Sequence, residues 1–198
     1  MSEGTPGPSP FSGVSARPTA ARRSFLERLL GALRLDASVY DEIEHDEEAL
    51  PQAAGVVALA AVCAGIGGAA GGSAGLVVGV IGAVIGWLVS AGIIWFIGVR
   101  LMEHTSDYPE LLRTIGFASS PQVLLVLAAI PALAWGVRAV VFVWGLAAYV
   151  VAVRQALDVD TARAVLVCVL GLGLAVVVAF LLVSLAGGCT PPGGGSMA

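Results

Sequence analysis

The chain alternates between long apolar runs and short polar segments, and the runs have the length of membrane spans. Residues Pro51 to Val99 contain no Asp, Glu, Lys, Arg or His. This stretch is long enough for two spans of about 20 residues each, and the Gly-rich segment 67–73 supplies the turn between them. The pattern predicts an all-α polytopic membrane bundle with five transmembrane helices, at 51–71, 75–99, 114–133, 135–154 and 164–186.

A polar arm precedes the first span. Residues 1–21 are broken by prolines and poor in apolar side chains, so we expect a disordered tail. Residues 22–35 place leucines on one helical face and arginines on the others, which is typical of a helix that lies on an anionic leaflet or packs against the protein's own loops. Ser38 and Asp41 have the spacing to cap a second helix through Glu48, and its acidic side chains should keep this helix solvated.

The densest polar cluster of the membrane region opens the third span. Asp107 and Glu110 have the spacing of a capping box. Pro121 should kink the helix and free a backbone carbonyl, which nearby serine hydroxyls can satisfy, and Gln122 needs a partner helix or water. The candidate functional residues of this cluster are Ser119, Ser120, Pro121 and Gln122, and Ser90 of the second span is the other hydroxyl that could line a path.

Small residues recur every four positions in the second span. The two series are Gly75, Gly79 and Ala83, and Gly82, Gly86 and Ser90. Such repeats let two helix backbones approach closely in lipid. The second span is therefore expected to be a packed, central helix, either within the monomer or across a homo-oligomer, and Gly82, Gly86 and Ser90 are its candidate packing residues.

Composition supports the membrane interpretation and narrows the partners. Hydrophobic residues make up 58 % of the 198 residues, charged residues make up 12 %, and the mean hydropathy is +0.92. One soluble core of this size cannot bury so much apolar surface. The net charge is −4, and acids gather in the run 41–48 without a basic stripe elsewhere, so a nucleic-acid partner is excluded and membrane lipid is implied.

Candidate metal ligands are sparse. Glu103 and His104 share a loop, and His45 in the arm could join them. These residues lack the regular spacing that marks metal sites. We therefore expect neither a metal nor a cofactor.

Arginine positions predict the orientation. All ten basic residues are Arg, as is typical of a GC-rich bacterial genome. With the amino terminus in the cytoplasm, nine arginines lie on that side and Arg138 alone lies outside. The expected location is a bacterial cytoplasmic membrane with the carboxyl terminus outside. The chain then divides into a disordered tail (1–21), a cytoplasmic helical arm (22–50), a membrane domain (51–186) and a flexible outer tail (187–198).

Four stretches resemble bacterial members of the Yip (Ypt-interacting-protein) domain family. They are Phe25–Asp36 with Tyr40–Glu44, Glu110–Ala118, and Val151–Asp158. The resemblance covers about residues 24–186 in order. It adds Arg113, Gly116, Phe117, Arg154 and Asp158 to the candidate residues.

The resemblance implies a fold and a topology. Eukaryotic relatives are five-span proteins of the early secretory pathway with a cytosolic amino terminus, and they associate with Rab-type GTPases and with one another. Their third span carries Gly-Tyr followed by Pro, and Gly116, Phe117 and Pro121 stand in similar places here. Their amino-terminal Asp-Leu-Tyr-Gly-Pro motif is missing. The resemblance therefore carries no activity over to this chain.

The function expected from the sequence is that of a non-enzymatic adaptor or organiser, which recruits a protein partner or lipid at the cytoplasmic face. The alternative is a small transporter or channel that uses the polar region from Ser119 to Gln122. Coupled carriers usually keep ionisable groups at mid-membrane, and no span interior has one here. No catalytic motif accompanies the serines, so an enzyme is not expected.

Overall fold

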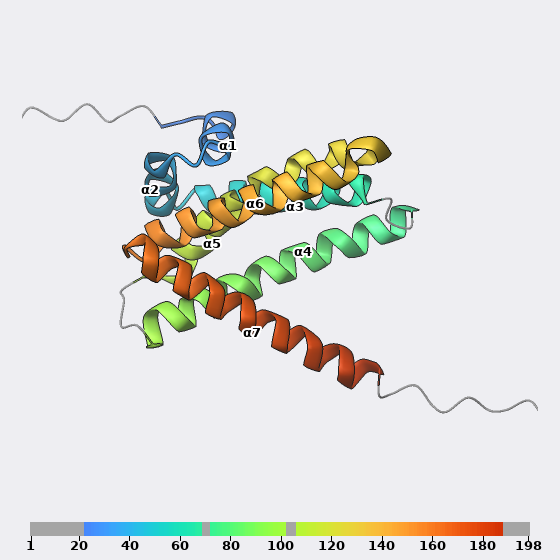
Figure 1. Cartoon of the computed structure of the whole chain (residues 1–198). Coiled ribbons are helices and arrows are strands. Elements are labelled where there is room, and N and C mark those ends of the chain that lie inside the picture. The colour runs from blue at the N-terminus through green and yellow to red at the C-terminus, as the bar shows by residue number, and fades with distance from the viewer. Residues whose placement is uncertain (1–21, 69–71, 102–105, 188–198) are drawn as a thin grey trace, which may run out of the picture.

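The structure, a computed structural model, describes residues 22–68, 72–101 and 106–187, and every element in these ranges is helical (Figure 1). The all-α fold is confirmed. Two short helices form the arm, α1 (Phe25–Leu33) and α2 (Ala37–His45). The bundle consists of α3 (Ala49–Gly67), α4 (Gly72–Trp95), the π-helical η1 (Phe96–Leu101), α5 (Tyr108–Ala118), the 3₁₀-helical η2 (Ser120–Ala129), α6 (Pro131–Ala156) and α7 (Thr161–Gly187). The predicted terminal tails lie outside the described residues, Gly187 excepted.

Four stretches of the described chain are long and apolar enough to cross a membrane. They are Ala49–Gly67, Gly72–Arg100, Tyr108–Ala129 and Pro131–Ala156. The backbone of α7 extends over 27 residues, but the part identified as an apolar helix is the shorter Thr161–Leu174. The chain is thus a multi-pass membrane protein, and its fifth span stays a prediction.

All five predicted apolar segments begin earlier in the structure than the apolar pattern predicted. Helices α3, α4 and α7 begin two or three residues earlier, at Ala49, Gly72 and Thr161, and the other two differ more. The third membrane helix starts at Tyr108 rather than at 114, because Asp107 and Glu110 form the expected capping box and nucleate the helix ahead of the apolar run. Helix α6 starts at Pro131 rather than at 135, because proline fits the first turn of a helix, where no N–H partner is needed.

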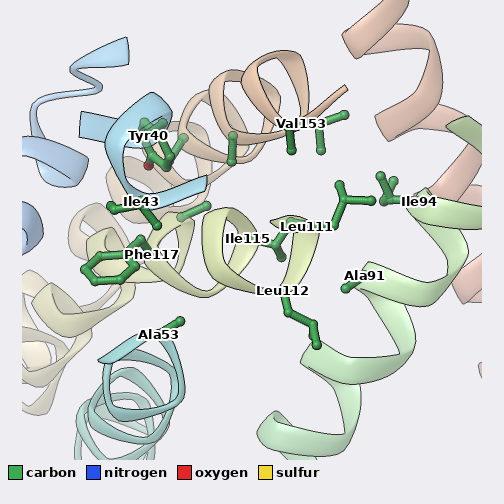
Figure 2. Close-up of a cluster of buried hydrophobic side chains, with 14 of the residues drawn as sticks. Tyr40, Ile43, Ala53, Ala91, Ile94, Leu111, Leu112, Ile115, Phe117 and Val153 are labelled. Atoms are coloured by element: carbon green, nitrogen blue, oxygen red, sulfur yellow. The ribbon is translucent and has the colours of Figure 1, made fainter. Parts of the chain in front are cut away.

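Helix α5 occupies the centre of the bundle. Every residue from Leu111 to Ala118 is buried. Figure 2 shows α5 between the arm, α3, α4 and α6, whose labelled side chains are Tyr40, Ile43, Ala53, Ala91, Ile94 and Val153. All of these residues belong to one buried apolar cluster. The helix that follows the polar stretch at the start of the third span therefore forms the core of the protein.

The prediction that the second span is the central, packed helix is wrong within the chain. Helix α4 presents most of its surface outward, and a methyl group added at Gly82 or Gly86 would meet nothing within 4 Å. Trp87 is one of its few buried residues, and its indole Nε1 donates to the carbonyl of Leu112 at 3.0 Å. Gly79, Gly82 and Gly86 do not pack against another helix inside the monomer, although Ala83 of the repeat packs against the core. Use of the repeat across a homo-oligomer stays a prediction.

The close approach occurs instead at Gly116 and Gly67. A Cβ at Gly116 would lie 2.7 Å from the Cβ of Ala53 and 3.2 Å from its backbone, so α5 and α3 touch directly. A Cβ at Gly67 would lie in collision with the carbonyl oxygen of Leu125 on η2. The sequence singled out Gly116 by resemblance, and its structural reason is this contact.

Pro121 changes the helix type rather than only kinking the helix. Helix α5 ends at Ala118, and the chain continues as a 3₁₀ helix with Pro121 in its first turn. The amide of Gln122 donates to the carbonyl of Ser119 at 3.0 Å, an i to i+3 bond. The expected capping by serine hydroxyls is not seen in the described residues, where the Ser120 hydroxyl has no partner.

Replacing Gly116 with alanine should destabilise the bundle, because the new methyl group overlaps Ala53 and overpacking typically costs about 1–3 kcal/mol. The measurement is thermal unfolding of both proteins in the same detergent. Gly136→Ala on α6 is the matched control, since its methyl group meets nothing within 4 Å and alanine favours a helix. Equal melting temperatures for Gly116→Ala and the control would contradict the close approach.

Candidate functional site

The arm is fixed to the bundle by Arg28, whose side chain is only 1 % exposed. Its Nη2 lies 2.8 Å from a carboxylate oxygen of Glu42 and 2.6 Å from one of Asp46. Its Nη1 donates to the side-chain oxygen of Gln52 on α3 at 3.2 Å. Because a buried charge needs compensating charge and hydrogen bonds, Arg28 holds α1, α2 and the start of α3 at one point.

The opposite charges at this junction stabilise each other's ionised forms. Burial alone would lower the pKa of Arg28, but hydrogen bonds to Asp46 and Glu42 raise it above its usual value. Burial likewise opposes ionisation of Asp46, yet the hydrogen bond from Arg28 brings the Asp46 pKa below its usual value. Both groups therefore stay charged at neutral pH, and the ion pair is permanent there.

The prediction of a solvated acidic helix is wrong. Tyr40 and Ile43 are fully buried, and Glu44 and Asp46 are each 7 % exposed. Glu42 and Asp46 are counter-ions of Arg28 on α1 and of arginines just before it, and the apolar residues between these acids cover α5. The run of acidic residues predicted a solvated helix, because the sequence alone does not show that arginines from the preceding segment lie beside the carboxylates.

The helix caps of the arm also differ from the prediction. Asp36, rather than Ser38, caps α2, since its side chain accepts from the amide of Ser38 at 3.0 Å. Ser24 and Glu27 form a capping box at the start of α1 that the sequence analysis overlooked. These caps fix the start of each helix and hence the direction in which Arg28 points.

Arg113, one of the predicted candidates, joins the arm to α5. Its Nη2 donates to the backbone carbonyl of Glu44 at 2.5 Å. That carbonyl belongs to the last turn of α2, where a cation is favoured by the helix dipole. The Arg113 Nε is buried without a partner among the described residues. Arg113 thus acts here as a docking residue.

Two aromatic contacts extend the docking along α1. The indole Nε1 of Trp144, midway along α6, donates to the carbonyl of Leu33 at 2.9 Å. The rings of Phe25 and Phe117 lie 6.4 Å apart in a tilted arrangement. Helix α1 therefore lies against the flank of the bundle rather than above its end (Figure 1).

The outward side of α1 is apolar and carries charge at its ends. Leu26 is 64 % exposed and Leu30 is 48 % exposed. Arg22 and Arg34 are exposed at the two ends of the helix. A helix with this distribution suits the boundary between acyl chains and headgroups.

Glu44 has the most acidic surroundings in the arm. No hydrogen bond reaches its carboxylate from the described residues. Burial raises the pKa of Glu44 to about 7, repulsion from Asp158, Glu110 and Asp41 acts in the same direction, and His45 opposes it. The carboxyl group therefore exchanges its proton near neutral pH.

The same turn of α2 could hold a divalent cation. Asp41, Glu44 and His45 place one ligand atom each within 4.8 Å of one another, and carboxylates and imidazole are suitable ligands. The sequence suggested His45 together with Glu103 and His104 as possible ligands, but Glu103 and His104 lie outside the described residues. The i, i+3, i+4 spacing of Asp41, Glu44 and His45 on a single helix was not recognised.

A polar cavity lies inside the bundle, between α3, α4, α5, η2 and α6. Its volume is about 220 Å³. Three predicted candidates line it, Ser90, Ser119 and Gln122, together with Trp87 and Tyr149. Their hydroxyl and amide groups can hydrogen-bond to a polar solute or to a lipid headgroup. Tyr149 was missed because it is a lone tyrosine in an apolar run, where no spacing marks the face that it occupies.

The remaining candidates do not gather with this cavity. Arg154 donates to the side-chain oxygen of its neighbour Gln155 at 3.2 and 3.1 Å. Asp158 is exposed in the turn before α7, with a left-handed φ of 49°. Ser120 and Pro121 are buried in the packing of η2. The predicted set therefore separates into docking, packing and cavity-lining residues.

Docking of the arm should weaken as pH rises. The pKa of Glu44 is raised from 4.5 to about 7 in the docked state. Between these two pH values the docked arm keeps a proton that the free arm releases. Docking is therefore strongest below pH 4.5 and weakens as the pH rises to about 7. The quantity to measure is the hydrogen-exchange rate of α2 amides in wild type divided by the rate in Glu44→Gln. We expect this ratio to be at least about tenfold higher at about pH 8 than at about pH 5. The variant has the same intrinsic exchange chemistry at each pH. An identical ratio at both pH values would contradict the buried, titrating carboxyl group.

Comparison with known protein families matches most of the chain to one family. The model of the family described as the Yip1 domain matches residues 38–185, which is most of the chain. Searches of curated proteins and of solved structures found no match. The matched range begins in α2 and ends in α7, so it takes in nearly all of the docked acidic helix and of the described bundle. The chain therefore belongs to the Yip1 domain family of membrane proteins.

Proposed function

We propose that the protein is a non-enzymatic membrane organiser that works through its arm at the cytoplasmic face, where α1 engages anionic lipid and the α1–α2 unit recruits a protein partner. One observation carries the proposal. Arg28 docks the arm with its charge fully compensated, and yet the same helix keeps Leu26 and Leu30 on its outward side. In a soluble arm these leucines would be expected to face the bundle.

Lipid engagement is supported by energetics and by charge. Burying a leucine side chain is worth about 1.5–3 kcal/mol, so Leu26 and Leu30 together provide a sizeable driving force for contact with acyl chains. Arg34 is exposed at the carboxyl end of the helix and can meet a lipid phosphate, whereas Arg22 forms ion pairs with Asp46 and Glu48. In the proposed orientation the amino terminus is cytoplasmic, the carboxyl terminus is outside and the membrane is a bacterial cytoplasmic membrane, in which nine of the ten arginines lie inside.

A protein partner would meet the acidic side of the arm. Asp41, Glu47 and Glu48 are exposed there, next to His45. A basic surface on the partner is the matching chemistry. Because Glu44 titrates near neutral pH in this turn, partner binding and arm docking would share one charge cluster.

A second candidate function is transport of a small polar solute. The observation that favours it is that Ser90, Ser119 and Gln122 line one cavity with Tyr149. In this case, protein reconstituted in liposomes should move the solute, and Gln122→Leu should abolish the movement by removing the amide while keeping most of the volume. Flux that is absent in wild type, or equal in Gln122→Leu, would exclude this function.

The organiser proposal is tested by point substitutions rather than by deletion of the arm, since Tyr40 and Ile43 cover α5 and their loss would expose the core. The full chain is placed in nanodiscs with or without phosphatidylglycerol, and hydrogen exchange of amides 25–33 is measured. In wild type, exchange should be slower with the anionic lipid. In Leu26→Glu/Leu30→Glu it should be at least about tenfold faster in both discs, because the apolar contribution is lost.

The control and the partner measurement use the same discs. Leu26→Met/Leu30→Met keeps both exposed side chains apolar and should exchange like wild type. Proteins that co-purify with wild type in native nanodiscs should be reduced in the double variant. Equal exchange of all variants in both lipids, with unchanged co-purification, would refute the organiser proposal.

A further inference from the structure

A large cleft opens between α4, η2, α6 and α7 and shares part of its lining with the polar cavity. Its volume is about 730 Å³, within the range of small-molecule sites. Most of its wall is apolar, with Ile94, Val141, Leu146 and Leu172 among the lining residues. Ser90, Gln122 and Tyr149 line both spaces, so the cleft has a polar inner end.

The cleft has one charged residue, Arg138. Its Nη2 donates to the carbonyl of Gly67, at the carboxyl end of α3, at 2.9 Å. None of the described carboxylates forms an ion pair with it. The described acidic residues all precede the first span or lie in 106–113 and 155–163, at the opposite end of the bundle. Within the part of the chain that the structure describes, Arg138 therefore has no counter-ion.

The position of Arg138 along α6 indicates the leaflet in which an anionic lipid group would meet it. Arg138 is seven residues from the start of α6 at Pro131, or about 10 Å along the helix axis. Its guanidinium reaches the end of α3, which is the end away from the arm. Long arginine side chains in membranes extend in this way to lipid phosphates. Arg138 thus lies at headgroup level in the leaflet opposite the arm, while the cleft extends inward from it.

The volume of the cleft distinguishes between possible occupants. A spanning helix of about 20 residues is about 30 Å long and about 10 Å wide with its side chains. The volume of such a helix is roughly three times that of the cleft. A second copy of a membrane helix therefore does not fit inside it. A single acyl chain is long and narrow, and it matches an apolar cleft that begins at headgroup level.

We propose that this cleft binds one phospholipid from the leaflet opposite the arm, with its phosphate on Arg138 and an acyl chain along α6 towards Gln122 and Tyr149. The site lies at the other end of the molecule from the lipid contact of α1, and the inference goes beyond the organiser function. Apolar walls hold the chain, and the free guanidinium donors of Arg138 hold the phosphate. The remaining bond to Gly67 keeps the guanidinium at the mouth of the cleft.

The experiment uses the full chain in detergent, titrated with phosphatidylglycerol and followed by native mass spectrometry. Wild type should retain one phospholipid per chain. Arg138→Gln should weaken retention by about tenfold, since charge-assisted hydrogen bonds to phosphate are lost. Gly145→Leu should weaken retention to a similar degree, because Gly145 lines the cleft and its new side chain fills space in which a Cβ meets nothing within 4 Å.

Gly136→Leu is the matched control on the same helix. A Cβ there also meets nothing within 4 Å, and Gly136 does not line the cleft, so this variant should retain lipid like wild type. Retention equal to wild type in both Arg138→Gln and Gly145→Leu would overturn the proposal. Loss in Gly145→Leu alone would overturn the phosphate contact, and recovery of a non-lipid molecule from the cleft would overturn the lipid as its occupant. None of these variants alters the arm, so the outcome is independent of the organiser proposal.

Discussion

The arrangement of the protein depends on the neutralisation of a guanidinium that water does not reach. Arg28 is nearly fully buried, and only the adjacent carboxylates of Glu42 and Asp46 make that burial tolerable. Once this ion pair forms, α2 must lie beside α1, and Tyr40 and Ile43 are then carried onto α5. A local charge requirement thus determines which surface closes the core at one end of the bundle.

The centre of the bundle obeys a second constraint, the distance between backbones. Helices in lipid gain little from hiding apolar surface, so close packing has to hold them together. Gly116 and Ala53 provide that closeness between α5 and α3. Helix α4 has more glycines than α5, but Gly82 and Gly86 face open space within the chain. The position of a glycine relative to a neighbouring helix, rather than the number of glycines, decides which helix becomes central.

The helical class, the apolar segments and the α5 cap could be predicted because each depends on residues close together in sequence. Asp107 and Glu110 needed only their own spacing. The central position of α5 could not be predicted, because it depends on Ala53 lying opposite Gly116, a pairing between separate helices. The buried arm acids were misread for the same reason, since the solvation of Asp46 is decided by Arg28. In the cavity, Ser90, Ser119 and Gln122 were found as rare polar residues, whereas Tyr149 was not.

The 3₁₀ segment η2 has a consequence for the dimensions of the third span. A 3₁₀ helix rises about 2.0 Å per residue, against 1.5 Å for an α-helix. The ten residues of η2 therefore extend about 5 Å farther than the same residues would as an α-helix. Tyr108–Ala129 contains 22 residues, and this stretching lets it cross a hydrocarbon core of about 30 Å even though its first turns lie under the arm. The backbone is also thinner there, and it is at this narrow part that the carbonyl of Leu125 comes close enough to Gly67 to exclude any side chain.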